Sequence, residues 1–126
     1  VVEQREGAVI YHCSAGKDRA GVISALLLRL LGAEDSAIYA DYLYTNTALS
    51  HELEEAQSAA LARSGDERAA KYVLGFFAAC PCWLAAALDT LDKRFYSIEG
   101  YIAQMTKVTG WEAEEFKRIC IEKSPD

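Results

Sequence analysis

The ten residues from position 12 to position 21, which read HCSAGKDRAG, constrain the fold of this chain more than any other stretch. They follow a short apolar run at residues 8–11 and precede a strongly apolar segment at residues 22–31. A turn from a strand into a helix directs its loop amides and the N-terminus of the helix at one point, where an anion is favoured. We therefore predict an anion-binding loop, called the cradle below, at residues 12–21.

The segment before the cradle predicts the class of fold. Residues 8–13 are apolar on both faces, which is typical of a strand inside a parallel sheet. No second convincing strand follows, and a lone strand leaves its backbone donors and acceptors unpaired. We expect an α/β fold in which this chain supplies one central strand, the cradle and a mostly helical layer, with partner strands from outside these residues. Residues 1–6 resemble the end of a preceding helix that Gly7 stops.

Hydrophobic spacing and capping residues predict the helices that follow. The segment 22–31 is apolar nearly all round, which predicts a central buried helix, and Gly32 is placed to end it. Residues 64–66 predict a break, and Pro81 suits the first turn of a helix over 82–95. The other expected helices span 34–49, 52–63, 67–79, a short segment capped by Ser97, and a final helix opened by the capping box TGWE at 109–112.

The same spacing predicts which side chains are buried. The helix over 82–95 is expected to turn inward Leu84, Leu88, Leu91 and Phe95, and the final helix Trp111, Phe116, Ile119 and Cys120. The longest apolar window, residues 75–88, is shorter than the roughly 20 residues of a membrane span and contains Pro81. We interpret it as buried helix and expect no stable membrane insertion.

Charge and cysteine content narrow the possible functions. The net charge of −6 argues against a general nucleic-acid binder and against a protein held on anionic lipid by bulk charge, so an anion site must be local. The four cysteines match no small secreted scaffold and no signal peptide is visible, so we expect a reducing, cytoplasmic location. Cys80 and Cys82 lack a second ligand pair for a metal, and we interpret them, like Cys120, as core residues.

The residues of the cradle suit attack on a phosphate ester. Cys13 attacks as a thiolate, which converging loop amides and a helix N-terminus favour by lowering the pKa of the thiol. Arg19 presents a planar fork that holds two phosphate oxygens at once, which a lysine cannot copy. The small residues Ala15 and Gly16 let the backbone wrap closely around an oxyanion.

These residues resemble the cysteine-dependent phosphatases with a Cys-x5-Arg signature. The match is closer to the bacterial and fungal tyrosine-phosphatase-like group, whose loop reads HCxAGKDR. Further similar segments lie at residues 31–32, 40–42, 84–89 and 97–101. The resemblance covers residues 1–126, which would form the C-terminal part of a single phosphatase domain.

The resemblance implies hydrolysis of phosphomonoesters through a phosphocysteine on Cys13, without cofactor or metal. Substrates would be phosphotyrosine and also phosphoserine, phosphothreonine or phosphoinositides, on a phosphorylated protein or a lipid. The implied phosphate-binding residues are Ser14, Ala15, Gly16, Lys17, Asp18 and Arg19. Lys17 would add charge for a multiply phosphorylated ring, Asp18 would assist proton transfer, and His12 and Gly21 would support the loop.

Two departures from the family leave alternatives open. Ala20 stands where relatives have Thr or Ser, so the hydroxyl that eases breakdown of the intermediate is absent. Relatives also carry an N-terminal half with further strands and an acid-bearing loop, which would be a partner of this chain. One alternative is therefore a catalytically weak or inactive phosphate-binding module. Another is the helical portion of a truncated product with an exposed apolar surface.

Overall fold

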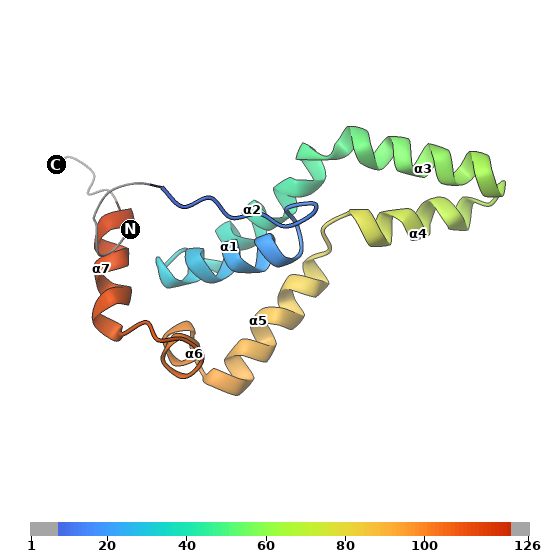
Figure 1. Cartoon of the computed structure of the whole chain (residues 1–126). Helices are drawn as coiled ribbons and strands as arrows, with labels where there is room; N and C mark the ends of the chain where they lie inside the picture. Colours follow the sequence, from blue (N-terminus) through green and yellow to red (C-terminus); the bar gives the residue numbers. More distant parts are fainter. Residues whose placement is uncertain (1–7, 122–126) are drawn as a thin grey trace.

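The computed structural model describes residues 8–121, and within them it contains seven helices and no strand (Figure 1). The helices are α1 (Arg19–Leu30), α2 (Asp35–Ala48), α3 (Ser50–Ser64), α4 (Glu67–Phe77), α5 (Pro81–Phe95), α6 (Ile98–Met105) and α7 (Gly110–Cys120). The helix end expected at residues 1–6 and its stop at Gly7 lie outside the described residues.

The expectation of an α/β fold with a central strand is wrong. Residues 8–13 have no regular secondary structure, and their apolar side chains lie at the surface, with Ile10 90% exposed. A strand is stable only when a neighbouring strand pairs with its backbone, and no second extended segment lies beside this one in residues 8–121. The apolar pattern of residues 8–13 therefore predicted a strand that has nothing to pair with here.

Local signals place most helix ends correctly. Gly32 adopts a left-handed conformation with φ of +84°, as predicted for a residue that ends a helix. The amide of Gly32 donates to the Arg29 carbonyl, and the amide of Ala33 donates to the Leu28 carbonyl, which together form a Schellman motif. Gly65 is likewise left-handed between α3 and α4, with φ of +64°. The breaks predicted at Gly32 and at residues 64–66 are confirmed.

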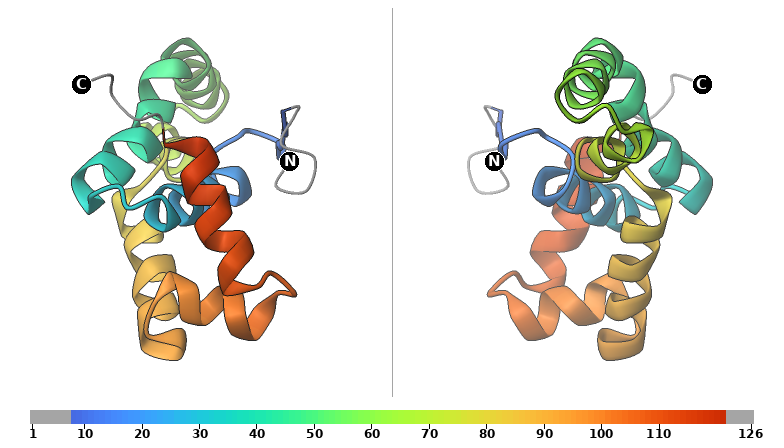
Figure 2. Two further views of the ribbon diagram at one scale, coloured as in Figure 1. Left: turned by 90° about the vertical axis from the view of Figure 1, so that its left-hand side faces the viewer. Right: turned by 90° about the vertical axis from the view of Figure 1, so that its right-hand side faces the viewer.

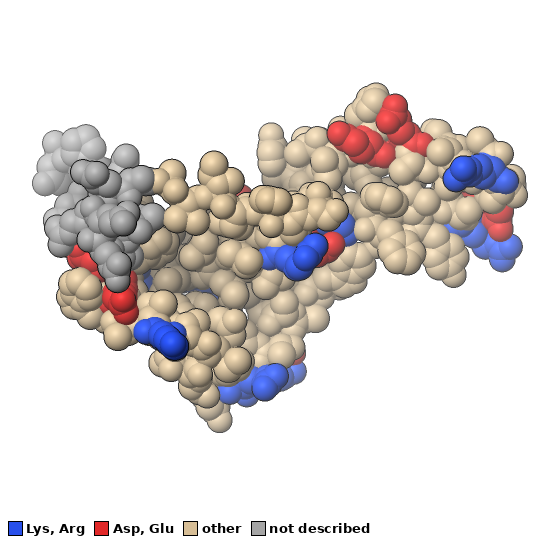
Figure 3. Space-filling view, in the orientation of Figure 1, with Lys and Arg blue, Asp and Glu red and all other residues tan. Residues whose placement is uncertain are grey.

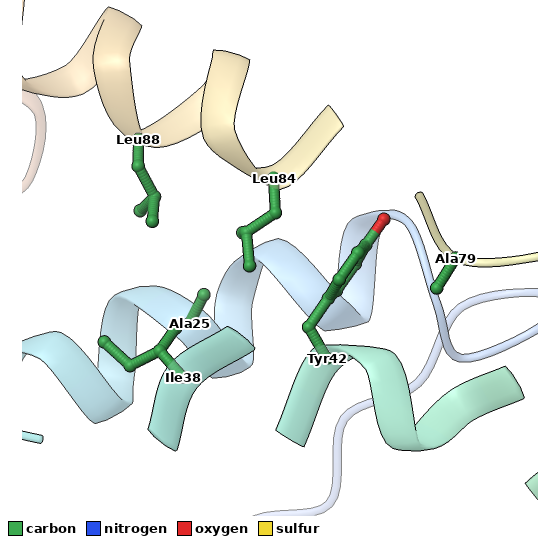
Figure 4. Packing of buried hydrophobic residues seen from close by; sticks show 6 residues of the cluster. All are labelled: Ala25, Ile38, Tyr42, Ala79, Leu84 and Leu88. Carbon is green, nitrogen blue, oxygen red and sulfur yellow. The ribbon is translucent and has the colours of Figure 1, made fainter. Parts of the chain in front are cut away.

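The main core lies where α1, α2 and α5 meet (Figure 4). Ile38 of α2 and Leu84 of α5 are fully buried, and Leu88 packs beside them, as predicted for α5. Gly21 lets α1 approach α2 closely, since a Cβ atom there would lie 2.9 Å from Cδ2 of Tyr42. The predicted burial of α1 on all sides is wrong, because α1 has neighbours on only part of its circumference and leaves Ile23 exposed.

A second, smaller core joins the other ends of α1 and α5 to α6 and α7. Its buried residues are Leu30, Leu91, Ile98 and Ala113. Arg29 of α1 donates two hydrogen bonds, of 2.9 and 3.0 Å, to the carboxylate of Asp92 on α5. Both predicted caps are confirmed: the Ser97 hydroxyl accepts from the Gly100 amide, and Thr109 and Glu112 form the capping box of α7.

Helix α7 packs through a face that the sequence predicted only in part, because Phe116 packs against the second core as predicted and Ile119 is half-buried. Trp111 is 69% exposed and Cys120 is exposed, while Ala113 and Glu115 are buried. Trp111 lies two residues before Ala113, about 200° around the helix, so the two cannot face the same neighbour. The prediction that Trp111 and Cys120 are buried is wrong, because α7 meets the second core through Ala113 and Phe116.

Helices α3 and α4 form a hairpin that projects from the two cores (Figures 1 and 2). They lie side by side, and α4 contributes no buried residue. By length and composition alone the stretch Glu67–Phe95 is apolar enough to cross a membrane, with a mean hydropathy of 1.6 in its best window. The structure divides that stretch into α4 and α5, of 11 and 15 residues, each below the roughly 20 needed for a span.

The interpretation of residues 75–88 as buried helix is wrong. Helix α4 ends at Phe77, and α5 begins at Pro81 with the proline in its first turn, as predicted for that residue. Between them, the backbone of Ala78 and of Cys80 is extended. Phe76 and Phe77 of α4 and Trp83 of α5 are all exposed, because no other element of residues 8–121 covers them.

Candidate active site

The cradle is a bend between the irregular segment 8–13 and α1. Gly16 has a left-handed φ of +72°, which a residue with a Cβ atom adopts only with strain, and this allows the turn to close. Asp18 is the N-cap residue of α1, and Arg19 is its first residue. The free amides at the start of α1 therefore lie within the cradle, where the helix N-terminus carries partial positive charge.

The thiol of Cys13 is held toward the thiolate form. The backbone amide of Ala20 makes the largest contribution to lowering the pKa of Cys13, and the amides of Gly16 and Ala15 act in the same direction. The charge of Arg19 lowers this pKa further, while partial burial opposes the shift. Residue 20 thus supports the thiolate through its amide, although it has no hydroxyl group.

The structure separates the predicted phosphate ligands into two groups. Exposed at the mouth of the cradle are Ser14, Ala15, Gly16, Asp18 and Arg19. Lys17 differs, because its side chain is only 4% exposed. The Nδ1 atom of His12 lies 3.3 Å from the Cys13 carbonyl oxygen, beside the loop that His12 is predicted to support. The roles predicted for these residues stay predictions, and their placement is consistent with an anion held at residues 14–16, 18 and 19.

Lys17 reaches from the cradle to the junction between α4 and α5. Its Nζ atom donates to the carbonyl of Ala78 over 3.3 Å and lies 4.8 Å from the centre of the Trp83 ring. It also lies 3.2 Å from the carboxylate of Asp18. The ammonium group is therefore engaged by a carbonyl, a ring and a carboxylate, a role that the loop motif does not reveal.

Asn46 holds the same junction from the other side. Its Oδ1 atom accepts from the Ala79 amide over 2.6 Å, and its Nδ2 atom donates to the Ala79 carbonyl over 2.9 Å. A side-chain amide thus pairs with both backbone groups of Ala79 between the two helices, where no backbone partner is found for them in residues 8–121. Sequence reasoning did not predict this role, although a polar side chain on the same stripe of α2 as the buried Ile38 and Tyr42 was a signal for it.

Asp18 lies at the boundary of two open cavities. The larger, of about 730 Å³, is lined by Lys17, Asp18, Arg68, Lys71, Tyr72, Gly75, Phe76 and Trp83. The smaller, of about 420 Å³, is lined by Asp18, Arg19, Val22, Ile23, Tyr42, Trp83 and Leu84. Burial raises the pKa of Tyr42, and the negative charge of Asp18 adds to that rise. Asp18 and Trp83 therefore separate a space beside Arg19 from a space beside the hairpin.

The cysteines away from the cradle do not form part of the core. Cys80 and Cys82 are joined by a disulfide across Pro81, and Cys82 is exposed. Their interpretation as buried core residues is wrong, because the start of α5 lies at the edge of the main core. Among residues 8–121 no group of three or more His, Cys, Asp or Glu side chains is arranged to hold a metal ion.

An activated thiol, converging amides and an arginine at one helix N-terminus define a nucleophilic oxyanion loop. Comparison with known families agrees with this chemistry. The model of the tyrosine phosphatase family matches residues 1–122. The chain therefore belongs to the tyrosine phosphatase family, as the resemblance of its loop predicted.

Two relatives illustrate the match. The chain is 34% identical over 103 residues to the triple specificity protein phosphatase PtpB of Mycobacterium tuberculosis, across 75% of this chain and 37% of that protein. It is 48% identical over 42 residues to a tyrosine-protein phosphatase of Nostoc commune, across 33% of this chain and 14% of that protein. The matched region thus spans little more than a third of the first relative and less of the second.

Proposed function

We propose that the protein hydrolyses phosphomonoesters, with phosphotyrosine as its principal substrate, through a phosphocysteine on Cys13. The observation that carries this proposal is the thiol of Cys13, whose pKa is lowered by the amides of Ala20, Gly16 and Ala15. A thiolate in that position is the form that attacks phosphorus. Membership of the tyrosine phosphatase family supports the same reaction.

The reaction proceeds in two displacements. The Cys13 thiolate donates an electron pair to phosphorus, and the bond between phosphorus and the ester oxygen breaks. Arg19 holds two phosphoryl oxygens while the charge redistributes, and the leaving oxygen takes a proton, for which the exposed carboxyl group of Asp18 is the candidate donor within the cradle. Water then attacks phosphorus and gives a proton to the Asp18 carboxylate, the phosphorus–sulfur bond breaks, and inorganic phosphate leaves as the thiolate is restored.

A wider substrate range is part of the proposal. The relative from Mycobacterium tuberculosis is named a triple specificity protein phosphatase, which supports a substrate range wider than phosphotyrosine alone. The further substrates proposed are those that the resemblance of the loop implies: phosphoserine, phosphothreonine or phosphoinositides. Both cavities beside Asp18 are open to solvent, so neither restricts entry to one flat phenyl ring. The substrate would be a phosphorylated protein or a phosphoinositide.

The nucleophile can be tested in the full-length protein with para-nitrophenyl phosphate. Cys13→Ser is expected to abolish hydrolysis, while Cys120→Ser, which changes an exposed thiol on α7, leaves it unchanged. Rapid acid quenching of the wild-type protein with labelled substrate should trap phosphate on Cys13. Wild-type turnover by Cys13→Ser would refute the assignment.

A second candidate function is phosphate binding without turnover, and Ala20 favours it. The hydroxyl that would assist breakdown of the intermediate is absent at this position. In that case the protein would bind tungstate through Arg19 and release no phosphate from any ester. Ala20→Thr separates the two functions, since it should speed turnover by an enzyme and leave a binding module inactive.

A further inference from the structure

The disulfide between Cys80 and Cys82 has no role in the two displacements described above. It crosses Pro81 and joins the N-cap residue of α5 to the first turn of that helix. We propose that this disulfide is a reversible redox site, which a low-molecular-weight thiol reduces and which controls how firmly Lys17 is held away from an anion in the cradle. The second half of the proposal rests on the proposed function, because it assumes that the cradle binds the phosphoryl group.

A structural role does not account for the disulfide. A disulfide stabilises a fold mainly by constraining the unfolded chain, and the gain rises with the length of the loop that the bond closes. Here the two cysteines are only two positions apart, so this gain is small. The same stretch is already fixed by Pro81 in the first turn of α5 and by the hydrogen bonds between Asn46 and Ala79. The bond therefore adds little to stability, and its redox chemistry is the better explanation for it.

The position of the disulfide favours its reduction. Cys82 is exposed, so a thiolate reaches its Sγ atom from solvent. Cys80 is half-buried and is the N-cap residue of α5, whose first turn contains no acidic side chain. The partial positive charge of a helix N-terminus stabilises a thiolate, which makes Cys80 the better leaving group. An exposed disulfide whose reduced form is stabilised in this way is readily reduced.

Reduction takes place in two exchanges that balance in atoms and electrons. The thiolate of one small thiol attacks Sγ of Cys82, the bond between the two protein sulfurs breaks, and Cys80 leaves as a thiolate. A second small thiolate then attacks the small-thiol sulfur of the mixed disulfide, and Cys82 leaves as a thiolate. Two small thiols have become one small disulfide, two electrons have passed to the protein, and the two protons pass to the cysteine thiolates or to water. The same steps in reverse restore the protein disulfide.

The disulfide lies between the two groups that hold the Lys17 ammonium. The carbonyl of Ala78 accepts from Lys17 over 3.3 Å, two residues before Cys80. The ring of Trp83, directly after Cys82, has its centre 4.8 Å from the Lys17 Nζ atom. The disulfide holds the Cα atoms of its two cysteines 5.3 Å apart, which fixes the path of the chain between these groups. After reduction the first turn of α5 keeps only its hydrogen bonds, and helix ends held in this way fray, so the junction holds Lys17 less firmly.

A released Lys17 adds a positive charge that the cradle needs. The chain carries a net charge of −6, and on the face shown in Figure 3 the basic side chains lie in separate small groups. In the sequence of the cradle, Arg19 is the other permanent cation, and Asp18 carries negative charge. An ammonium group that turns from the junction to the cradle attracts a phosphate dianion. The reduced protein should therefore bind oxyanions more tightly than the oxidised protein.

Glutathione redox buffers test the first half of the proposal in the full-length protein. Cys13→Ser is the background, so that the cradle thiol takes no part in the exchange. After acid quenching, free thiols are alkylated with N-ethylmaleimide, and the peptide that contains residues 80–82 is analysed by mass spectrometry. We expect the disulfide to open and to form again as the ratio of reduced to oxidised glutathione changes, while the circular dichroism spectrum stays native. A disulfide that opens only in urea overturns the proposal.

Tungstate binding, measured by calorimetry on the same background, tests the coupling to Lys17. The reduced protein should bind tungstate about two- to fivefold more tightly than the oxidised protein, as expected for one additional exposed ion pair. Cys80→Ala combined with Cys82→Ala should give the affinity of the reduced protein in every buffer. Lys17→Met should remove the dependence on redox state. The matched control is Cys120→Ser, which replaces an exposed thiol on α7 and should keep the dependence.

The outcomes separate this proposal from the proposed function. Equal tungstate affinity of the oxidised and reduced proteins overturns the coupling, and so does a dependence on redox state that persists in Lys17→Met. Weaker binding on reduction also overturns it, because the junction would then hold Lys17 in place for the anion. None of these results contradicts the proposed hydrolysis, which is judged by the release of phosphate from para-nitrophenyl phosphate by the wild-type protein.

Discussion

The main core and the α3–α4 hairpin are both built from α-helices, but the core buries its apolar side chains whereas the hairpin leaves most of its side chains exposed. In the core, Ile38 and Leu84 are fully buried between α1, α2 and α5. In the hairpin, Leu53 is the one buried residue of α3, and α4 has none. Burial of apolar area dominates folding stability, so the core stabilises the cradle while the hairpin leaves its aromatic side chains available for contacts.

The two regions are joined by directional polar contacts. Lys17 binds the carbonyl of Ala78, and Asn46 binds both backbone groups of Ala79. Hydrogen bonds fix geometry but contribute modest net stability, typically about 0.5–1.5 kcal/mol each. A cradle residue, Lys17, therefore takes part in setting the orientation of the hairpin relative to the core.

The largest expected effect contrasts one side chain from each region. Leu84→Ala should lower the free energy of unfolding by about 2–5 kcal/mol, because it opens a cavity in a fully buried site. Phe76→Ser should change it by less than about 0.5 kcal/mol, since the ring is exposed. Urea unfolding followed by circular dichroism measures both. Equal destabilisation by the two substitutions would contradict the contrast between core and hairpin.

The next largest effect is expected at the junction between α4 and α5. Asn46→Ala removes both hydrogen bonds to Ala79 and should lower the protection of the junction by about 1–3 kcal/mol. Hydrogen exchange followed by mass spectrometry should show faster exchange at residues 78–80 and unchanged exchange in α5. Thr47→Ala, at an exposed position on the same helix, is the control. Faster exchange throughout α5 would mean that Asn46 stabilises the core rather than the junction.

Two glycines allow the same substitution to be compared in both regions. Gly21→Ala places a Cβ atom 2.9 Å from the buried ring of Tyr42 and should destabilise by about 1–2 kcal/mol after the gain in helix propensity. Gly75→Ala meets nothing within 4 Å and should stabilise α4 by about 0.5–1 kcal/mol. Thermal unfolding of the two variants reports the opposite signs. If both substitutions stabilise the protein, α1 must shift at Gly21 to make room for the added methyl group.

The smallest expected effect concerns the cradle itself. The pKa of Cys13 is lowered, so its thiolate persists to lower pH than that of free N-acetylcysteine. Alkylation of Cys13 by iodoacetamide, followed by peptide mass spectrometry, should therefore continue at pH values where the free thiol is unreactive. Arg19→Met should move the midpoint of this reaction slightly toward alkaline pH, since the charge of Arg19 is a lesser cause of the shift. An unchanged midpoint would mean that the amides act alone.

Several parts of the molecule were predictable because their causes are local. Gly32 and Gly65 end helices, Pro81 begins one, and Thr109 caps another through contacts within a few residues. The cradle motif is local in the same sense, because its amides and the start of α1 are neighbours in the chain. Family membership followed from that motif.

The errors share a different physical origin. The strand at residues 8–13 needed a partner that the pattern of side chains does not supply. Trp111 was predicted to be buried from the hydrophobic pattern of its helix, yet α7 meets the second core through Ala113 and Phe116. Burial depends on which neighbours are present, and the hydrophobicity of one segment carries no information about them.

The sequence alone determined the residues of the cradle, the order of the helices and the family. Only the tertiary structure decided which distant groups these residues contact. Lys17 contacts Ala78 and Trp83, and Asn46 forms hydrogen bonds with Ala79. An aromatic groove borders Asp18. Turns and caps are specified by residues a few positions apart, whereas Lys17 and Ala78 are 61 positions apart. Contacts over such separations depend on how whole helices pack, which no local pattern encodes.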